Sequence, residues 1–139
     1  MTPENYFDDE LSNTKDNSNN NNYNNAVLSI LYDCKNTLTE RSLDDLDKVL
    51  EKLENDIQSI HINYYEALHD ATLEQLAYNI KGQRKSLQSV SKTKDITARF
   101  KMEALLLSSI GKTIENYISS YRTRLMSTEE TIEQLLSML

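Results

Sequence analysis

The chain has 139 residues and a formal net charge of −7, with only two glycines and one proline. That length corresponds to one domain, since domains commonly run to about 100 to 150 residues. So few turn-forming residues exclude β-rich and α/β folds, which need such residues at their turns and crossovers. The composition therefore predicts an all-α protein.

Cysteine content and apolar runs predict the compartment. Cys34 is the single cysteine, so it has no partner for an intramolecular disulfide, and the N-terminus shows no signal-peptide pattern. No apolar run approaches the roughly 20 residues that span a bilayer. We therefore expect an intracellular protein without a membrane partner. The sequence does not distinguish nucleus from cytoplasm.

The charges are segregated along the chain. Residues 1–80 carry sixteen acids and five bases, residues 81–126 carry ten bases and three acids, and residues 127–139 carry three acids. Opposite charges of this kind can neutralise each other within one bundle or between two copies, or can simply form solvated surfaces.

Residues 1–25 form a polar tail that contains "NTKDNSNNNNYNN". A segment with so little apolar surface cannot offset the entropy of ordering, so we expect a disordered, acidic, Asn-rich tail followed by a helical domain over residues 26–139. Within the tail, Asn5–Leu11 reads "NYFDDEL", either an ordinary polar terminus or a short acidic and apolar motif that folds onto a basic groove of a partner.

The first predicted helix runs from Ala26 to about Glu40. Its apolar residues return at spacings of three and four, and the set is Ala26, Val27, Ile30, Leu31, Cys34 and Leu38. Cys34 belongs to this apolar face, and no histidine lies at a spacing that would activate it. We therefore expect it to act as a small hydrophobic residue and not as a nucleophile.

The second predicted helix follows an N-cap at Ser42 and carries the clearest periodicity in the chain. Its heptad a and d positions, which we call the a/d seam, are Leu43, Leu46, Leu50, Leu53, Ile57, Ile60 and Tyr64. Further apolar residues widen this seam towards a bundle with neighbours on two sides, namely Val49, Ile62, Tyr65 and Leu68. We interpret the acidic residues opposite the seam as solvated surface.

The two histidines do not predict a metal site. His61 and His69 lie eight positions apart, about 12 Å along a helix axis, which is too far for one ion without other ligands. We expect no metal, cofactor or catalytic residue. The heptad phase slips near residues 70–72, where Thr72 and Gln75 match a capping box and indicate a new helix or a kink.

A further helix reaches about residue 91, and residues 89–95, "SVSKTKD", form the predicted loop. Basic residues gather on both sides of this loop, and we call them the basic patch: Lys81, Arg84, Lys85, Lys92, Lys94, Arg99 and Lys101. A phosphate backbone or an acidic protein surface would fit them equally well.

The last long helix is predicted from Ile96 to Met126, with an apolar stripe of Phe100, Leu107, Ile110, Ile114, Tyr117, Tyr121 and Leu125. Within it, Tyr117 and Tyr121 share the buried stripe, whereas Arg122 and Arg124 point elsewhere and remain free for a partner. Ser127 and Glu130 match a second capping box. They predict a separate C-terminal helix with an apolar ridge at Leu135, Leu136 and Leu139.

The run from Met102 to Met126, ending "YISSYRTRLM", resembles the long helix of the helical domain in GINS subunits, and "LDKVLEKLENDI" precedes it in a similar order. The resemblance implies a scaffolding role in a four-subunit complex that holds the replicative helicase together.

The features together predict an antiparallel helical bundle that acts without catalysis. We expect a subunit or adaptor of a larger assembly that binds other helical proteins, as a hetero- or homo-oligomer. The partner-binding candidates are Arg122, Arg124, Leu135, Leu136 and Leu139. A GINS-like or other nucleic-acid-associated scaffold that uses the basic patch is the alternative.

Overall fold

The computed structural model describes residues 16–40 and 45–139, and all regular structure within these residues is helical. In chain order the elements are α2 (Asp16–Glu40), α3 (Leu46–Asn63), the short 3₁₀ helix η2 (Tyr65–His69), α4 (Ala71–Val90) and α5 (Ile96–Ser137). The predicted all-α fold is confirmed.

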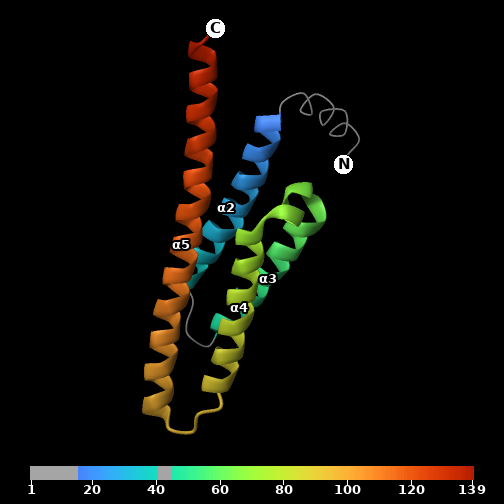
Figure 1. Ribbon diagram of the computed structural model, residues 1–139. Helices are drawn as coiled ribbons and strands as arrows, with labels where there is room; N and C mark the ends of the chain where they lie inside the picture. Colours follow the sequence, from blue (N-terminus) through green and yellow to red (C-terminus); the bar gives the residue numbers. More distant parts are fainter. Residues whose placement is uncertain (1–15, 41–44) are drawn as a thin grey trace.

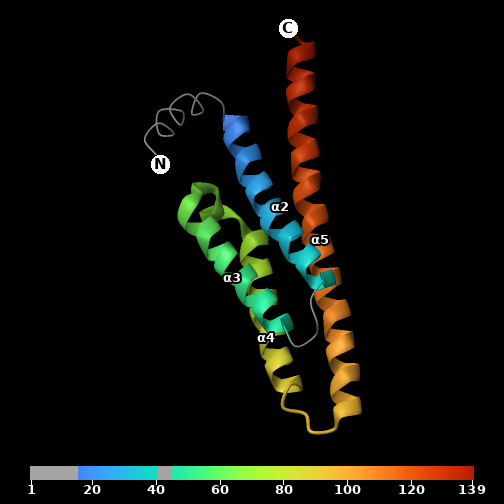
Figure 2. The ribbon, with the colours of Figure 1, turned by 180° about the vertical axis from the view of Figure 1, so that it is seen from behind.

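The four α-helices form an antiparallel bundle in which each helix contacts two others. Helix α2 packs against α3 and α5, and α4 also packs against α3 and α5. Consecutive helices run in opposite directions, so the bundle has the up-down-up-down arrangement that short connections favour (Figures 1 and 2).

Helix α2 begins at Asp16 rather than at the predicted Ala26, so the boundary between tail and bundle lies further towards the N-terminus. The reason lies in Tyr23, which is buried at 3 % exposure and continues the face of Val27 and Leu31 at spacings of four. Reading the asparagine run by composition alone missed this aromatic anchor. The remaining part of the predicted tail, residues 1–15 with the "NYFDDEL" motif, lies outside the described residues.

Helix α3 buries the predicted a/d seam. Leu50, Leu53 and Ile57 are nearly inaccessible, and Val49 widens the buried face as predicted. Tyr64 is only partly buried, and the first seam position, Leu43, lies outside the described residues together with the proposed cap Ser42.

The predicted extension of the seam beyond Ile60 is wrong. Ile62, Tyr65 and Leu68 are between 65 % and 82 % exposed. Helix α3 ends at Asn63 because Tyr64 adopts an extended conformation (φ −131°, ψ 121°), which breaks the helical periodicity before η2.

Aspartates cap the last two helices. The Asp70 carboxylate accepts hydrogen bonds from the backbone N–H groups of Thr72 and Leu73 at the start of α4, so Asp70, and not the predicted Thr72, is the N-cap. Asp95 caps α5 in the same way, through the N–H groups of Thr97 and Ala98.

Helix α5 continues without a break to Ser137, so the predicted separate C-terminal helix is wrong. The hydroxyl groups of Thr128 and Thr131 donate to the carbonyl oxygens of Arg124 and Ser127, four residues earlier in each case. Such bonds are typical of hydroxyl side chains in a helix interior, so the Ser127 capping pattern is not used. In the predicted stripe, Ile110, Ile114 and Tyr121 are buried, whereas Phe100 is 57 % exposed.

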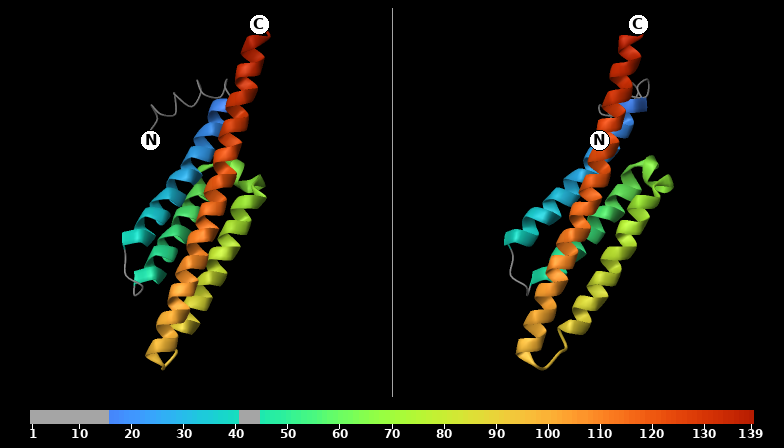
Figure 3. Two further views of the ribbon diagram at one scale, coloured as in Figure 1. Left: turned by 90° about the vertical axis from the view of Figure 1, so that its left-hand side faces the viewer. Right: turned by 60° about the vertical axis from the view of Figure 1, so that its left-hand side comes forward.

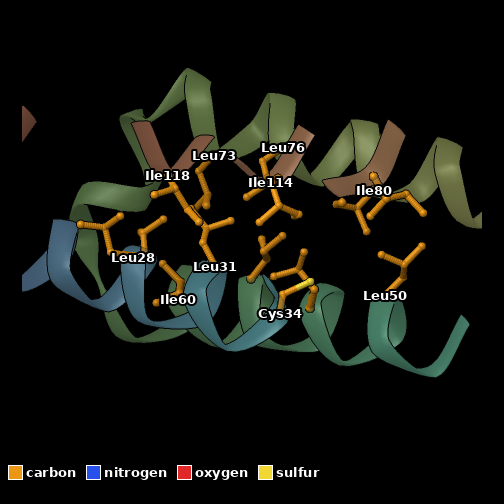
Figure 4. Close-up of a cluster of buried hydrophobic side chains, with 14 of the residues drawn as sticks. Leu28, Leu31, Cys34, Leu50, Ile60, Leu73, Leu76, Ile80, Ile114 and Ile118 are labelled. Atoms are coloured by element: carbon orange, nitrogen blue, oxygen red, sulfur yellow. The ribbon is translucent and has the colours of Figure 1, made fainter. Parts of the chain in front are cut away.

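Aliphatic side chains from all four helices fill the core (Figure 4). Cys34 lies among them as a free, buried thiol, and burial, followed by the nearby Asp33 and Asp56 charges, raises its pKa to about 12. A thiol with that pKa is largely protonated at neutral pH, which fits the hydrophobic role expected of Cys34.

Replacing Leu53 by aspartate tests the central role of the α3 seam. Leu53 is 1 % exposed, so Leu53→Asp would place an unpaired charge in the core. Domains of this size are stable by only about 5 to 15 kcal/mol, and we expect the variant to lose its helical circular dichroism signal at room temperature. Gln58→Asp, at an exposed site on the same helix, is the matched control and should melt near the wild-type temperature. A cooperative wild-type melt for Leu53→Asp would contradict the bundle.

Candidate functional site

A buried carboxylate joins three helices at one end of the bundle. Asp70 is 7 % exposed and lies between η2 and α4. Its Oδ2 atom accepts hydrogen bonds from the hydroxyl of Tyr23 on α2 at 2.6 Å and from the hydroxyl of Tyr121 on α5 at 2.5 Å. We call Asp70, Tyr23, Tyr121 and Arg124 the Asp70 cluster.

Arg124 completes this cluster from α5. Its Nη2 donates to Asp70 Oδ1 at 3.0 Å and to the Thr72 hydroxyl at 2.8 Å, and its Nη1 lies 3.2 Å from Asp70 Oδ2. The guanidinium carbon also lies 4.4 Å from the centre of the Tyr121 ring. Arg124 is therefore held by the bundle, which corrects the prediction that it is free; Arg122 is exposed as predicted. The physical reason is the three-residue spacing between Tyr121 and Arg124, which places both on one face of α5.

The electrostatics of the cluster favour an ionised carboxylate. Burial alone raises the pKa of Asp70, but hydrogen bonds from Arg124, Tyr121 and Tyr23 outweigh that cost and lower the pKa to about 2. Burial, followed by the hydrogen bond to Asp70, raises the pKa of both phenols well above the ordinary value. At neutral pH the phenols are therefore donors and Asp70 is the acceptor, an arrangement that stabilises the contact between the helices.

A shallow pocket of about 630 Å³ lies beside the cluster, between η2, the start of α4, residues 23–24 of α2 and residues 123–128 of α5. Most residues that line it carry polar groups, among them Tyr23, Asn24, Glu66, His69, Thr123 and Ser127. The Asn24 Oδ1 atom is buried and has no hydrogen-bond partner within the part of the chain that the structure describes. The ring of His69, another lining residue, packs edge-on against the ring of Tyr65, with ring centres 5.4 Å apart.

Two arginines of the predicted basic patch are paired with acids. Arg84 donates from Nε to Asp47 Oδ1 at 2.9 Å and from Nη1 to Glu54 Oε1 at 2.6 Å, which links α4 to α3. Arg99 donates to Glu103 at 3.2 Å within α5. The acids on α3 had been interpreted as solvated, and only the packing of α4 on α3 reveals the pairing. The lysines of the patch remain exposed: Lys81, Lys85, Lys92, Lys94 and Lys101.

Both ends of α5 expose large apolar side chains. Towards the C-terminus, Leu135, Leu136, Met138 and Leu139 are between 55 % and 101 % exposed, and we call them the C-terminal ridge. Figure 3 shows this part of α5 extending past the other helices. At the other end, where α4 and α5 are joined, Ile96, Phe100 and Leu105 are exposed near Lys92, Lys94 and Lys101; these six residues are the hairpin end.

Within residues 16–40 and 45–139, no three His, Cys, Asp or Glu side chains are grouped so as to hold a metal ion. None of the helices in this part of the chain combines the length and the apolar character that a membrane span needs. No protein-family model, curated protein or solved structure matches the sequence or its fold.

The pKa of Asp70 predicts a pH dependence of stability. A carboxyl group whose pKa falls from 3.8 to about 2 on folding stabilises the native state above pH 4, and this contribution is lost as the pH falls towards 2. The shift corresponds to about 2 kcal/mol. We expect the difference in unfolding free energy between wild type and Asp70→Asn, measured by urea denaturation, to shrink by about that amount from pH 5 to pH 2. For Glu51→Gln, at an exposed site, the difference should change little. A constant difference for Asp70→Asn would contradict the proposed stabilisation of the carboxylate.

Mutation of Arg122 and of Arg124 should have different effects on stability. Arg124→Ala removes the charged partner of a buried carboxylate, and we expect it to cost about 1 to 3 kcal/mol in urea denaturation. Arg122→Ala, at an exposed site two positions before Arg124 and outside the cluster, should change the unfolding free energy by less than about 0.5 kcal/mol. Equal losses in the two variants would show that the Arg124 contacts contribute nothing specific.

Proposed function

We propose that the chain is a non-enzymatic helical subunit or adaptor of a larger protein assembly and that it binds its partner by helix packing. The exposed C-terminal ridge on α5 carries this proposal. Contiguous apolar surface on a protein commonly marks an interaction site, and this surface lies on a helix anchored by its buried middle.

The spacing of the ridge supports a helical partner. Leu135, Leu136 and Leu139 of the ridge follow the partly buried Ile132 at positions i+3, i+4 and i+7, the pattern with which an amphipathic helix packs into a groove or onto a second helix. The same spacing continues the buried face of α5 through Ile118, Tyr121 and Leu125. Within the bundle α2 and α4 pack against α5, whereas the ridge is exposed.

A nucleic-acid-associated role remains the alternative, and the GINS-like scaffold is one form of it. The exposed lysines near the hairpin end support this alternative. Against it, Arg84 and Arg99 are paired with Asp47, Glu54 and Glu103, so they are less available to phosphate groups.

Site-specific photo-crosslinking in the native cell tests the proposed function. A photoreactive phenylalanine analogue at Leu136 should give discrete crosslinked proteins, whereas the same analogue at Ser119, an exposed position in the middle of α5, should not. Leu135→Asp with Leu139→Asp should remove the products without changing the circular dichroism spectrum, since both residues are exposed. Identical products from positions 136 and 119, or none from position 136, would count against the ridge as a binding surface.

A further inference from the structure

The two ends of α5 differ in charge as well as in position. Residues 127–139 contain Glu129, Glu130 and Glu133 and no base, and all three glutamates are exposed. The hairpin end exposes Lys92, Lys94 and Lys101. Of the acids nearby, Asp95 caps α5 and Glu103 is buried against Arg99.

Each end also combines its charge with exposed apolar side chains. The C-terminal ridge offers four large residues, and the hairpin end offers Ile96, Phe100 and Leu105, between 57 % and 72 % exposed. The two surfaces are therefore complementary in charge and alike in apolar character, the combination that favours specific association between proteins.

One molecule cannot bring these two surfaces together. Helix α5 has 42 residues and is continuous, so its ends lie about 60 Å apart. Figure 1 shows them at opposite ends of the molecule. The ridge therefore cannot bind the hairpin end of its own molecule. A second copy of this chain supplies both surfaces at once.

We infer that the C-terminal ridge of one copy packs against the hairpin end of a second copy. The glutamates of the first then face the lysines of the second. This inference rests on the proposed function, because it names the partner of the ridge. If each copy uses both ends, the copies form either a closed dimer or an open filament, depending on the angle between neighbouring copies.

Residues 1–15 are a less suitable occupant of the ridge. They contain Glu4, Asp8, Asp9 and Glu10 against the single base Lys15, so they carry the same sign of charge as the glutamates beside the ridge. Like charges brought together across an interface weaken association.

Exchange of the charges tests the inference in purified protein by sedimentation velocity at low salt. We expect the wild-type chain to show an average mass that rises with concentration. The triple variant Glu129→Lys, Glu130→Lys, Glu133→Lys and the triple variant Lys92→Glu, Lys94→Glu, Lys101→Glu should each associate about tenfold or more weakly, because each presents like charges at both ends. All six sites are exposed, and circular dichroism should confirm the fold of both variants.

Mixing the two triple variants provides the decisive comparison. Each end of one variant is then complementary to the opposite end of the other, and association should return in the equimolar mixture. Leu136→Asp should weaken the wild-type association, whereas Ser119→Asp should not. Deleting residues 1–15 should leave it unchanged.

Three results would overturn the inference: a wild-type chain that stays monomeric at all concentrations, a mixture that does not associate, or an association lost on deletion of residues 1–15. A monomeric wild type that still gives crosslinks from position 136 to a different protein would leave the proposed function standing. Loss of both self-association and all crosslinks would reject the two proposals together.

Discussion

The Asp70 carboxylate is the point on which the packing of the bundle depends. It caps α4 through two backbone N–H groups, accepts hydrogen bonds from Tyr23 and Tyr121, and pairs with Arg124. A buried charge is costly unless donors surround it, and here the donors come from three different helices. The polar cluster thus supplies what the aliphatic core does not, a unique relative position of α2, α4 and α5. Hydrophobic residues alone tolerate several packings of similar energy.

Helix α5 carries Tyr121 and Arg124 of this cluster, and the two surfaces proposed for binding lie at its ends. Its middle is fixed by Tyr121 and by buried isoleucines, and its two ends extend from that fixed section. Surfaces held on one continuous helix keep a defined separation, so the distance between the ridge and the hairpin end is set by the helix rise. The different charges at the two ends give the molecule a polarity along its long axis.

Much of the fold could be predicted from the sequence, because the spacing of apolar residues reports directly on helical faces. The seam at Leu46, Leu50, Leu53 and Ile57 and the burial of Tyr121 are of this kind. The start of α2 was misplaced because composition hid Tyr23 within an asparagine run. One signal was available: Tyr23, Val27 and Leu31 recur every four residues.

The Asp70 cluster could not be predicted in the same way. Its hydrogen bonds join residues separated by 47 and 51 positions, and no local pattern encodes which distant hydroxyl reaches which carboxylate. The same holds for Arg84, whose partners Asp47 and Glu54 looked solvated until α4 was placed against α3. The exposed ridge was visible in the sequence as apolar periodicity, but only the length of α5 showed that it leaves the bundle.

The position of Asp70 in the chain also bears on how the protein folds. Helices α3 and α4 with η2 make a local hairpin that brings Asp70 to its tip, and such short-range contacts form quickly. Tyr23 then arrives from the N-terminal side of the chain and Tyr121 from the C-terminal side. An intermediate in which α2 or α5 has not yet packed lacks one of the two phenol hydrogen bonds to Asp70. The cluster therefore stabilises partly formed states only a little. The cluster thereby couples the first and last helices, and the bundle is expected to fold and unfold as one cooperative unit.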